Sequence, residues 1–125
     1  MTSNPQFSHE KLEVYQLALK FVAWLTDVFP ELKESKDVRV REVIDQVDRA
    51  STSIVLNIAE GNGRRATKQR ARFFDDARGS ATECAGCLDV MVSKRALTGE
   101  RVAEGKILLV RIVSMLTKLV DKFDK

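Results

Sequence analysis

The stretch VREVIDQVDRASTSIVLNIAEG, residues 40–61, decides the fold of this chain. Its apolar side chains recur three or four residues apart, which is the spacing that places them on one face of a helix. They are Val40, Val43, Ile44, Val47, Ala50, Ile54 and Ile58. Gly61 suits the position just after a helix end. The pattern therefore predicts one long amphipathic helix over about 37–60.

Three further segments repeat this period, over about 9–28, 67–96 and 100–123. Ser8 and Thr67 are the expected N-caps of the first two, and Pro30 is the expected end of the first, because the residue before a proline avoids the helical region. The 125 residues hold only 2 prolines and 6 glycines, whereas an all-β domain needs a turn about every 8–12 residues. The sequence predicts an all-α single domain over 1–125, an antiparallel up-down-up-down four-helix bundle.

Small residues gather in the third predicted helix, where Gly79 and Gly86 lie among alanines, Ser80, Thr82 and two cysteines. A glycine inside a helix costs about 1 kcal/mol relative to alanine. Two of them favour a close approach by a neighbouring helix, and the alternative is a locally weak helix.

Basic side chains cluster between the second and third predicted helices. The chain as a whole has a formal net charge of only +3. Residues 61–80, however, carry two acidic side chains and six basic ones, which are Arg64, Arg65, Lys68, Arg70, Arg72 and Arg78. Arginines on a loop and a helix N-terminus suit phosphate contacts. The alternative is a solvated face with local salt bridges to Asp75 and Asp76.

The fourth predicted helix carries more apolar residues than one core-facing stripe needs. Ile107, Leu108, Leu109 and Val110 are consecutive, and at about 100° per residue they cannot all face one core. Leu108 and Met115, seven residues apart, form a second stripe. Exposed apolar stripes usually mark protein interfaces, so we expect a homo-oligomer with Leu108 and Met115 at its interface. A wide buried face in a monomer is the alternative.

None of the motifs for catalysis or metal binding is complete. Cys84 and Cys87 form a lone C-x-x-C in mid-helix beside Glu83, without the second ligand pair of a zinc site or the helix N-terminus of a redox site. His9 is the only histidine, and Asp75 and Asp76 diverge on a helix, so no acid–base or nucleophilic arrangement is supported. We expect packed thiols, no metal, no cofactor, no evident small-molecule substrate and no enzymatic activity.

Nothing in the sequence indicates a membrane. No apolar run approaches the roughly 20 residues of a membrane span, and Met1–Glu10 lacks the apolar core of a signal peptide. Two cysteines suit a reducing compartment. We expect a cytoplasmic protein.

Two segments of the sequence are more informative about the kind of protein than its overall composition is. Residues 49–61, RASTSIVLNIAEG, and residues 77–83, ARGSATE, together with LEVYQLA at 12–18, resemble the bacterial four-helix-bundle proteins of the 23S rRNA intervening-sequence family over nearly the whole chain. The family's recurring positions fall on Gln46, Arg49, Asn57, Glu60, Gly61, Gly79, Ser80 and Glu83. Where the family often has an acidic residue followed by an aromatic one, this chain has Gln69 and Arg70.

The resemblance implies an antiparallel bundle that assembles into pentameric rings and has no catalytic residues to carry over. It also implies kinship with an accessory protein of diversity-generating retroelements that engages nucleic acid and a reverse transcriptase. From the residues, we expect Asn57, Glu60 and Glu83, together with Arg49, to form a polar network between the second and third helices and to bond each other or a neighbouring subunit, since buried polar groups need partners.

These observations lead to one functional hypothesis and one rival. The first is a non-enzymatic homo-oligomer, a pentamer by resemblance, that binds structured RNA or other nucleic acid through the basic cluster. The second is a protein-interaction scaffold, accessory to a protein such as a polymerase, with no direct role in nucleic-acid binding.

Overall fold

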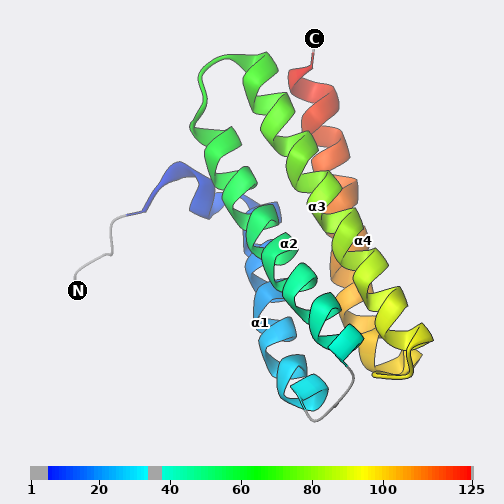
Figure 1. The fold of residues 1–125 in the computed structure, drawn as a ribbon. Helices are drawn as coiled ribbons and strands as arrows, with labels where there is room; N and C mark the ends of the chain where they lie inside the picture. The colour runs from blue at the N-terminus through cyan, green and yellow to red at the C-terminus, as the bar shows by residue number, and fades with distance from the viewer. Residues whose placement is uncertain (1–5, 34–37, 125) are drawn as a thin grey trace, which may run out of the picture.

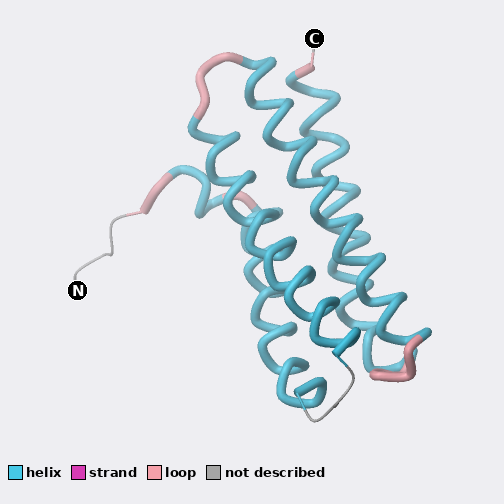
Figure 2. Tube along the Cα trace, viewed as in Figure 1, coloured by secondary structure: helices cyan, strands magenta, loops and turns pink. Residues whose placement is uncertain are grey.

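The fold is known from a computed structural model, which describes residues 6–33 and 38–124. A short 3-10 helix, η1 (Ser8–Lys11), precedes four long helices: α1 (Glu13–Lys33), α2 (Val38–Gly63), α3 (Thr67–Ser93) and α4 (Gly99–Phe123). Within the described ranges no residue belongs to a strand (Figure 2). The prediction of an all-α fold is confirmed.

The four helices form a bundle in which consecutive helices run in opposite directions (Figure 1). Helices α1 and α3 each pack against both α2 and α4. The α2–α3 connection and the end of α4 lie at the same end of the bundle, beyond the start of α1 (Figure 1). That end is therefore built from α2, α3 and α4, with η1 packed beside α2.

The core comes from the predicted apolar faces. Side chains that are essentially inaccessible include Phe21, Val28, Val47, Ile58, Phe74, Leu88, Ile112 and Leu116. Burying side chains of this size stabilises a fold by about 1.5–3 kcal/mol each. The faces that the helical period predicts to be apolar are therefore the faces that are buried in the structure.

Helix α1 continues past the proline that was expected to end it. Pro30 lies inside α1, which runs on to Lys33. Leu32, one turn after Val28, is 1% exposed, and Glu31 accepts three hydrogen bonds of 2.6–3.0 Å from Arg101 of α4. These contacts hold the last turn helical although Pro30 has no N–H to donate. The hydrogen bonds from Arg101 also lower the pKa of the Glu31 carboxyl.

Gly61 has a different role from the helix stop that was predicted. Helix α2 continues through it to Gly63, and no glycine in the described residues has a positive φ. A Cβ at Gly61 would lie 2.9 Å from Cβ of Phe73 and 3.2 Å from Cε1 of Phe74. The missing side chain therefore lets α3 approach α2, as glycine does at tight helix contacts.

Within the chain, no helix closely approaches Gly79 or Gly86, contrary to the expectation for these residues. Both are exposed, and a Cβ at either would meet nothing within 4 Å. The small residues of α3 that face the core are instead Ala77, Ala81 and Cys84. The second close approach lies on α4, where a Cβ at Gly105 would be 2.4–2.8 Å from the indole ring of Trp24.

The predicted helix ends are shifted by a few residues. Neither Ser8 nor Thr67 caps a helix, because the N-cap residues are Phe7 for η1 and Ala66 for α3, without a side-chain bond. Thr98 caps α4 by accepting from the N–H of Arg101. Helix α3 ends at Ser93 rather than at residue 96, and Arg95 turns the chain with φ 62°. The predicted start of the second helix at Asp37 lies outside the described residues.

Candidate nucleic-acid interface

The connection between α2 and α3 is fixed by an arginine of its own basic cluster. Arg70 donates to the backbone oxygens of Asn62 and Arg64, both at 3.2 Å, and to Oδ1 of Asn62 at 3.1 Å. Its guanidinium lies 4.6 Å from the centroid of the Phe123 ring. Since the last carbonyls of a helix lack intrahelical partners, Arg70 acts as the C-terminal cap of α2.

Two other arginines of the cluster also have partners within the chain. Arg64 pairs with Glu60 at 3.3 Å and lies over the ring of Phe73 at 4.9 Å. Arg78 pairs with Asp75 at 2.6 Å and donates to Oγ1 of Thr117. The Arg78–Asp75 pair is one of the salt bridges of the alternative, whereas Arg64 pairs with Glu60 instead of Asp75 or Asp76.

The remaining three cations, Arg65, Lys68 and Arg72, are exposed. None of their side chains forms an ion pair or hydrogen bond with any residue of 6–33 or 38–124. We call these three residues the free cations. They occupy the connection and the first turns of α3, whose N-terminus has no side-chain cap, so the uncapped N–H groups add partial positive charge beside them.

Shallow hollows run between these side chains. One of about 380 Å³ is lined by Lys68, Arg72, Arg78 and Val120, with Asp75 and Asp124 at its edge. Another of about 330 Å³ is lined by Arg64, Gln69, Arg72, Phe73 and Asp76. Arg72 borders both hollows, and the surface of the corner is predominantly basic, with the carboxylates of Asp75, Asp76 and Asp124 among the cations.

A polar seam joins α2 and α3 along the family-motif positions. Gln46 donates to Glu83 at 3.2 Å, and Ser53 and Ser80 share a hydrogen bond of 2.9 Å. Asn57 joins the seam by donating to the side-chain oxygen of Ser53.

Two residues of the predicted network lie outside this seam. Glu60 bonds Arg64, and Arg49 is exposed without a partner in the described part of the chain. Of the seam's bonds, Gln46–Glu83 and Ser53–Ser80 cross from α2 to α3, whereas that of Asn57 stays within α2. The described residues therefore do not show Asn57, Glu60 and Glu83 bonded to one another, as was expected.

Both cysteines are buried in the core as free thiols. Burial, together with Cys87 and Glu83, raises the pKa of Cys84 to about 12, and burial also raises the pKa of Cys87. Thiolates are the reactive form of cysteine, so these residues act as packing groups. In the described ranges no three histidine, cysteine or acidic side chains gather as metal ligands would, and no helix there is long and apolar enough to span a membrane.

The predicted oligomer stripe is only partly exposed. Leu108 and Met115 are half-buried against the core, whereas their neighbours Ile107 and Val110 are 62% and 69% exposed. Beside Val110 lies a groove of about 300 Å³ between α3 and α4, which is lined by Thr82, Ala85, Lys106, Leu109, Val110, Val113 and Ser114. Simple spacing identified the helix but not which of its apolar side chains point outward.

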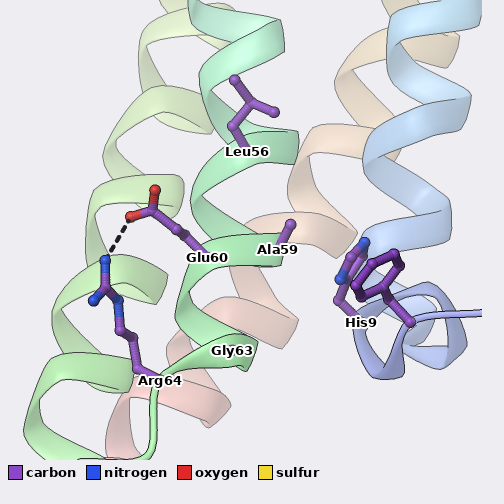
Figure 3. Close-up of a pocket in the computed structure, with 7 residues that line it drawn as sticks. His9, Leu56, Ala59, Glu60, Gly63 and Arg64 are labelled. Carbon is purple, nitrogen blue, oxygen red and sulfur yellow. Dashed lines mark hydrogen bonds and ion pairs between the residues drawn. The ribbon is translucent and has the colours of Figure 1, made fainter.

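Sequence reasoning missed a hollow on the other side of α2. Phe7 and His9 of the η1 segment stack at 5.6 Å with an interplanar angle of 20°, and the ring of Tyr15 meets His9 edge-on at 4.7 Å. Phe7 and His9 line a hollow of about 530 Å³ together with Leu56, Ala59, Glu60 and Gly63 of α2 and Arg64 just after it (Figure 3). In the sequence, this hollow is signalled only by Phe7, an apolar residue just before the first helix.

Comparison with known proteins places the chain in a family. A crystal structure at 1.70 Å of a protein of unknown function from the S23 ribosomal protein family of Bacteroides thetaiotaomicron VPI-5482 has the same fold, with a TM-score of 0.77. The two are 20% identical over 86% of this chain and 97% of that one. None of the curated proteins matches this sequence. The family model for the 23S rRNA-intervening sequence protein matches residues 10–118, and the chain therefore belongs to that family.

Proposed function

We propose that this protein is a non-enzymatic, homo-oligomeric helical bundle that binds structured RNA through the free cations Arg65, Lys68 and Arg72. One observation carries the proposal: these three residues are exposed and without partners in the described ranges, on a corner that their neighbour Arg70 holds in place. The family name, which refers to an intervening sequence of 23S rRNA, supports RNA as the partner.

A fixed corner suits recognition of a phosphate backbone. Cations that are already paired inside the protein must lose that partner before they bind a phosphate, whereas free cations need only displace counterions. Because the connection is already ordered by Arg70, binding does not carry the entropic cost of ordering it. Contacts of this kind position the protein on RNA without reading base sequence.

Three cations make a weak site, which self-association strengthens. If copies present the same corner on one assembly, the second contact becomes intramolecular and the overall affinity rises by multivalency. The exposed Ile107 and Val110, beside an apolar groove, support association through the α3–α4 face. Gly79 and Gly86 leave the surface of α3 low enough for another helix to approach closely.

The proposed binding is tested by titrating the protein with a hairpin RNA derived from 23S rRNA across about 50 to 200 mM salt. Three phosphate contacts predict that the logarithm of the binding constant falls against the logarithm of salt with a slope of about −2 to −3 for each engaged copy. Absence of binding at about 50 mM salt, or an affinity that does not change with salt, overturns the proposal.

Val110→Asp is expected to dissociate the oligomer. A carboxylate on a side chain that is 69% exposed in the single chain leaves the monomer fold intact but is buried without a partner in an interface. Val110 is a cleaner probe than Leu108 or Met115, whose half-buried side chains also contact the core. Light scattering measures the change.

The matched control is Leu19→Asp, on the exposed face of α1 with 44% of Leu19 accessible. This variant is expected to keep the mass of the wild-type assembly. A wild-type protein that is monomeric, or a Val110→Asp variant with unchanged mass, contradicts association through the α3–α4 face.

A further inference from the structure

The hollow between η1 and the C-terminal part of α2 has the character of a small-ligand site. Its volume of about 530 Å³ lies within the range of about 300–1,000 Å³ that such sites occupy. Figure 3 shows Ala59 and Leu56 along α2, the Glu60–Arg64 pair at one side and His9 across from them. The site therefore combines apolar walls with few, grouped polar side chains.

The aromatic side chain at this hollow is unusually exposed. Phe7 is 71% accessible, and Leu56, which also lines the hollow, is 61% accessible. The Phe7 ring is held by stacking on His9, which in turn contacts Tyr15. An aromatic group fixed in position but open on its outer surface is suited to stack a planar ligand, because stacking gains area at little cost in conformational entropy.

One residue links this hollow to the basic corner. Arg64 lines this hollow and also the one that Arg72 borders on the other side of the connection. A nucleic-acid strand that lies on the basic corner therefore has an apolar, aromatic hollow adjacent to its phosphate track. Single-stranded segments are held in this way, with cations along the backbone and aromatic side chains under the bases.

We propose that this hollow takes an unpaired nucleobase of the RNA bound at the basic corner, with Phe7 as its stacking partner. This inference rests on the proposed function and adds a preference within it: loops and bulges, whose bases can leave the stack, over uninterrupted duplex. Glu60 and Arg64 also line the hollow, but they are paired with each other, so stacking on Phe7 is the contact on which the proposal depends.

Phe7→Ala tests this site with two RNA probes. One is a hairpin with 2-aminopurine in its single-stranded loop, and the other is a blunt duplex of the same stem. Loss of one stacked base is expected to weaken binding of the loop RNA by about 5- to 100-fold and to abolish the 2-aminopurine fluorescence change. Binding of the duplex is expected to stay within about twofold.

Two further variants separate stacking from general hydrophobicity. Phe7→Trp keeps an aromatic surface and is expected to retain the affinity for the loop RNA. Leu19→Ala removes an equally apolar but distant side chain and is expected to change neither probe. Circular dichroism is used to check that each variant is folded.

The outcomes distinguish the two proposals. If Phe7→Ala binds the loop RNA as tightly as wild type, or loses affinity for loop and duplex alike, the base site is overturned while salt-dependent binding at the corner stands. If wild type binds neither RNA at low salt, the proposed function and this inference fail together.

Discussion

Replacing Arg65, Lys68 and Arg72 together by glutamine is expected to weaken RNA binding by about 100-fold. Each charge-assisted contact to a phosphate contributes about 1 kcal/mol or more, and about 1.4 kcal/mol corresponds to tenfold in affinity. The slope of the logarithm of the binding constant against the logarithm of salt is expected to become less negative by about 2 to 3 units. Glutamine keeps a long polar side chain, and because all three residues are exposed without partners in the described ranges, the fold is expected to remain stable.

The control carries the same charge change elsewhere. Lys20, Arg41 and Lys94 are exposed residues of α1, α2 and the α3–α4 connection, and their triple glutamine variant reduces the formal net charge from +3 by the same three units. Its affinity is expected to stay within a few-fold of wild type. Equal losses in the two variants, measured by fluorescence anisotropy at fixed salt, mean that binding follows overall charge and not the corner.

Gly105→Ala is expected to destabilise the bundle by about 1–3 kcal/mol, the usual cost of overpacking a core. The new methyl group would lie 2.4 Å from Cζ3 and 2.5 Å from Cη2 of Trp24. Trp24 is 6% exposed, and it packs against Phe21 at a ring-centroid distance of 5.7 Å. Moving the indole ring therefore disturbs further core side chains, and the thermal midpoint falls by several degrees.

Gly86→Ala is the same substitution in open space and is expected to have the opposite sign. Nothing lies within 4 Å of a Cβ at Gly86, so alanine stabilises the helix by up to about 1 kcal/mol. Urea unfolding of both variants as dilute monomers measures the difference. A Gly105→Ala variant as stable as wild type contradicts the packing of α4 against Trp24.

The glycines show which features of the helix packing can be predicted from the sequence and which cannot. The helical period of residues such as Ile54, Ile58 and Ile112 predicts which faces are buried, because every helix must bury its apolar stripe. The same period places Gly61, three residues after Ile58, and Gly105, three after Val102, on core faces, but it does not show how closely Phe73 or Trp24 approaches them, which depends on tertiary packing. Pro30 was misjudged for a related reason: contacts by Leu32 and Glu31 outweigh local propensity.

The sequence predicts where the candidate site lies, but it does not show which of its cations are paired within the chain. A run of six basic residues near a helix start locates the corner, yet spacing alone does not show that Arg70 serves Asn62 and Arg64 while Arg65 stays free. Arg70 is also packed against Phe123, which is more than fifty residues away in sequence. Phe7 was missed because it lies in a segment with no helical pattern, where apolar residues have no expected face.

The contact between Arg70 and Phe123 sets an order of events during synthesis. The free cations and the connection that carries them leave the ribosome early, but the aromatic ring beneath Arg70, and with it the contact to Phe74, is supplied by the last turn of α4. Chains fold as they are made, from the N-terminal side onward. The hydrogen bonds from Arg70 to Asn62 and Arg64 need only α2 and α3, whereas the ring that packs against its guanidinium is added last, after Phe123 has left the ribosome.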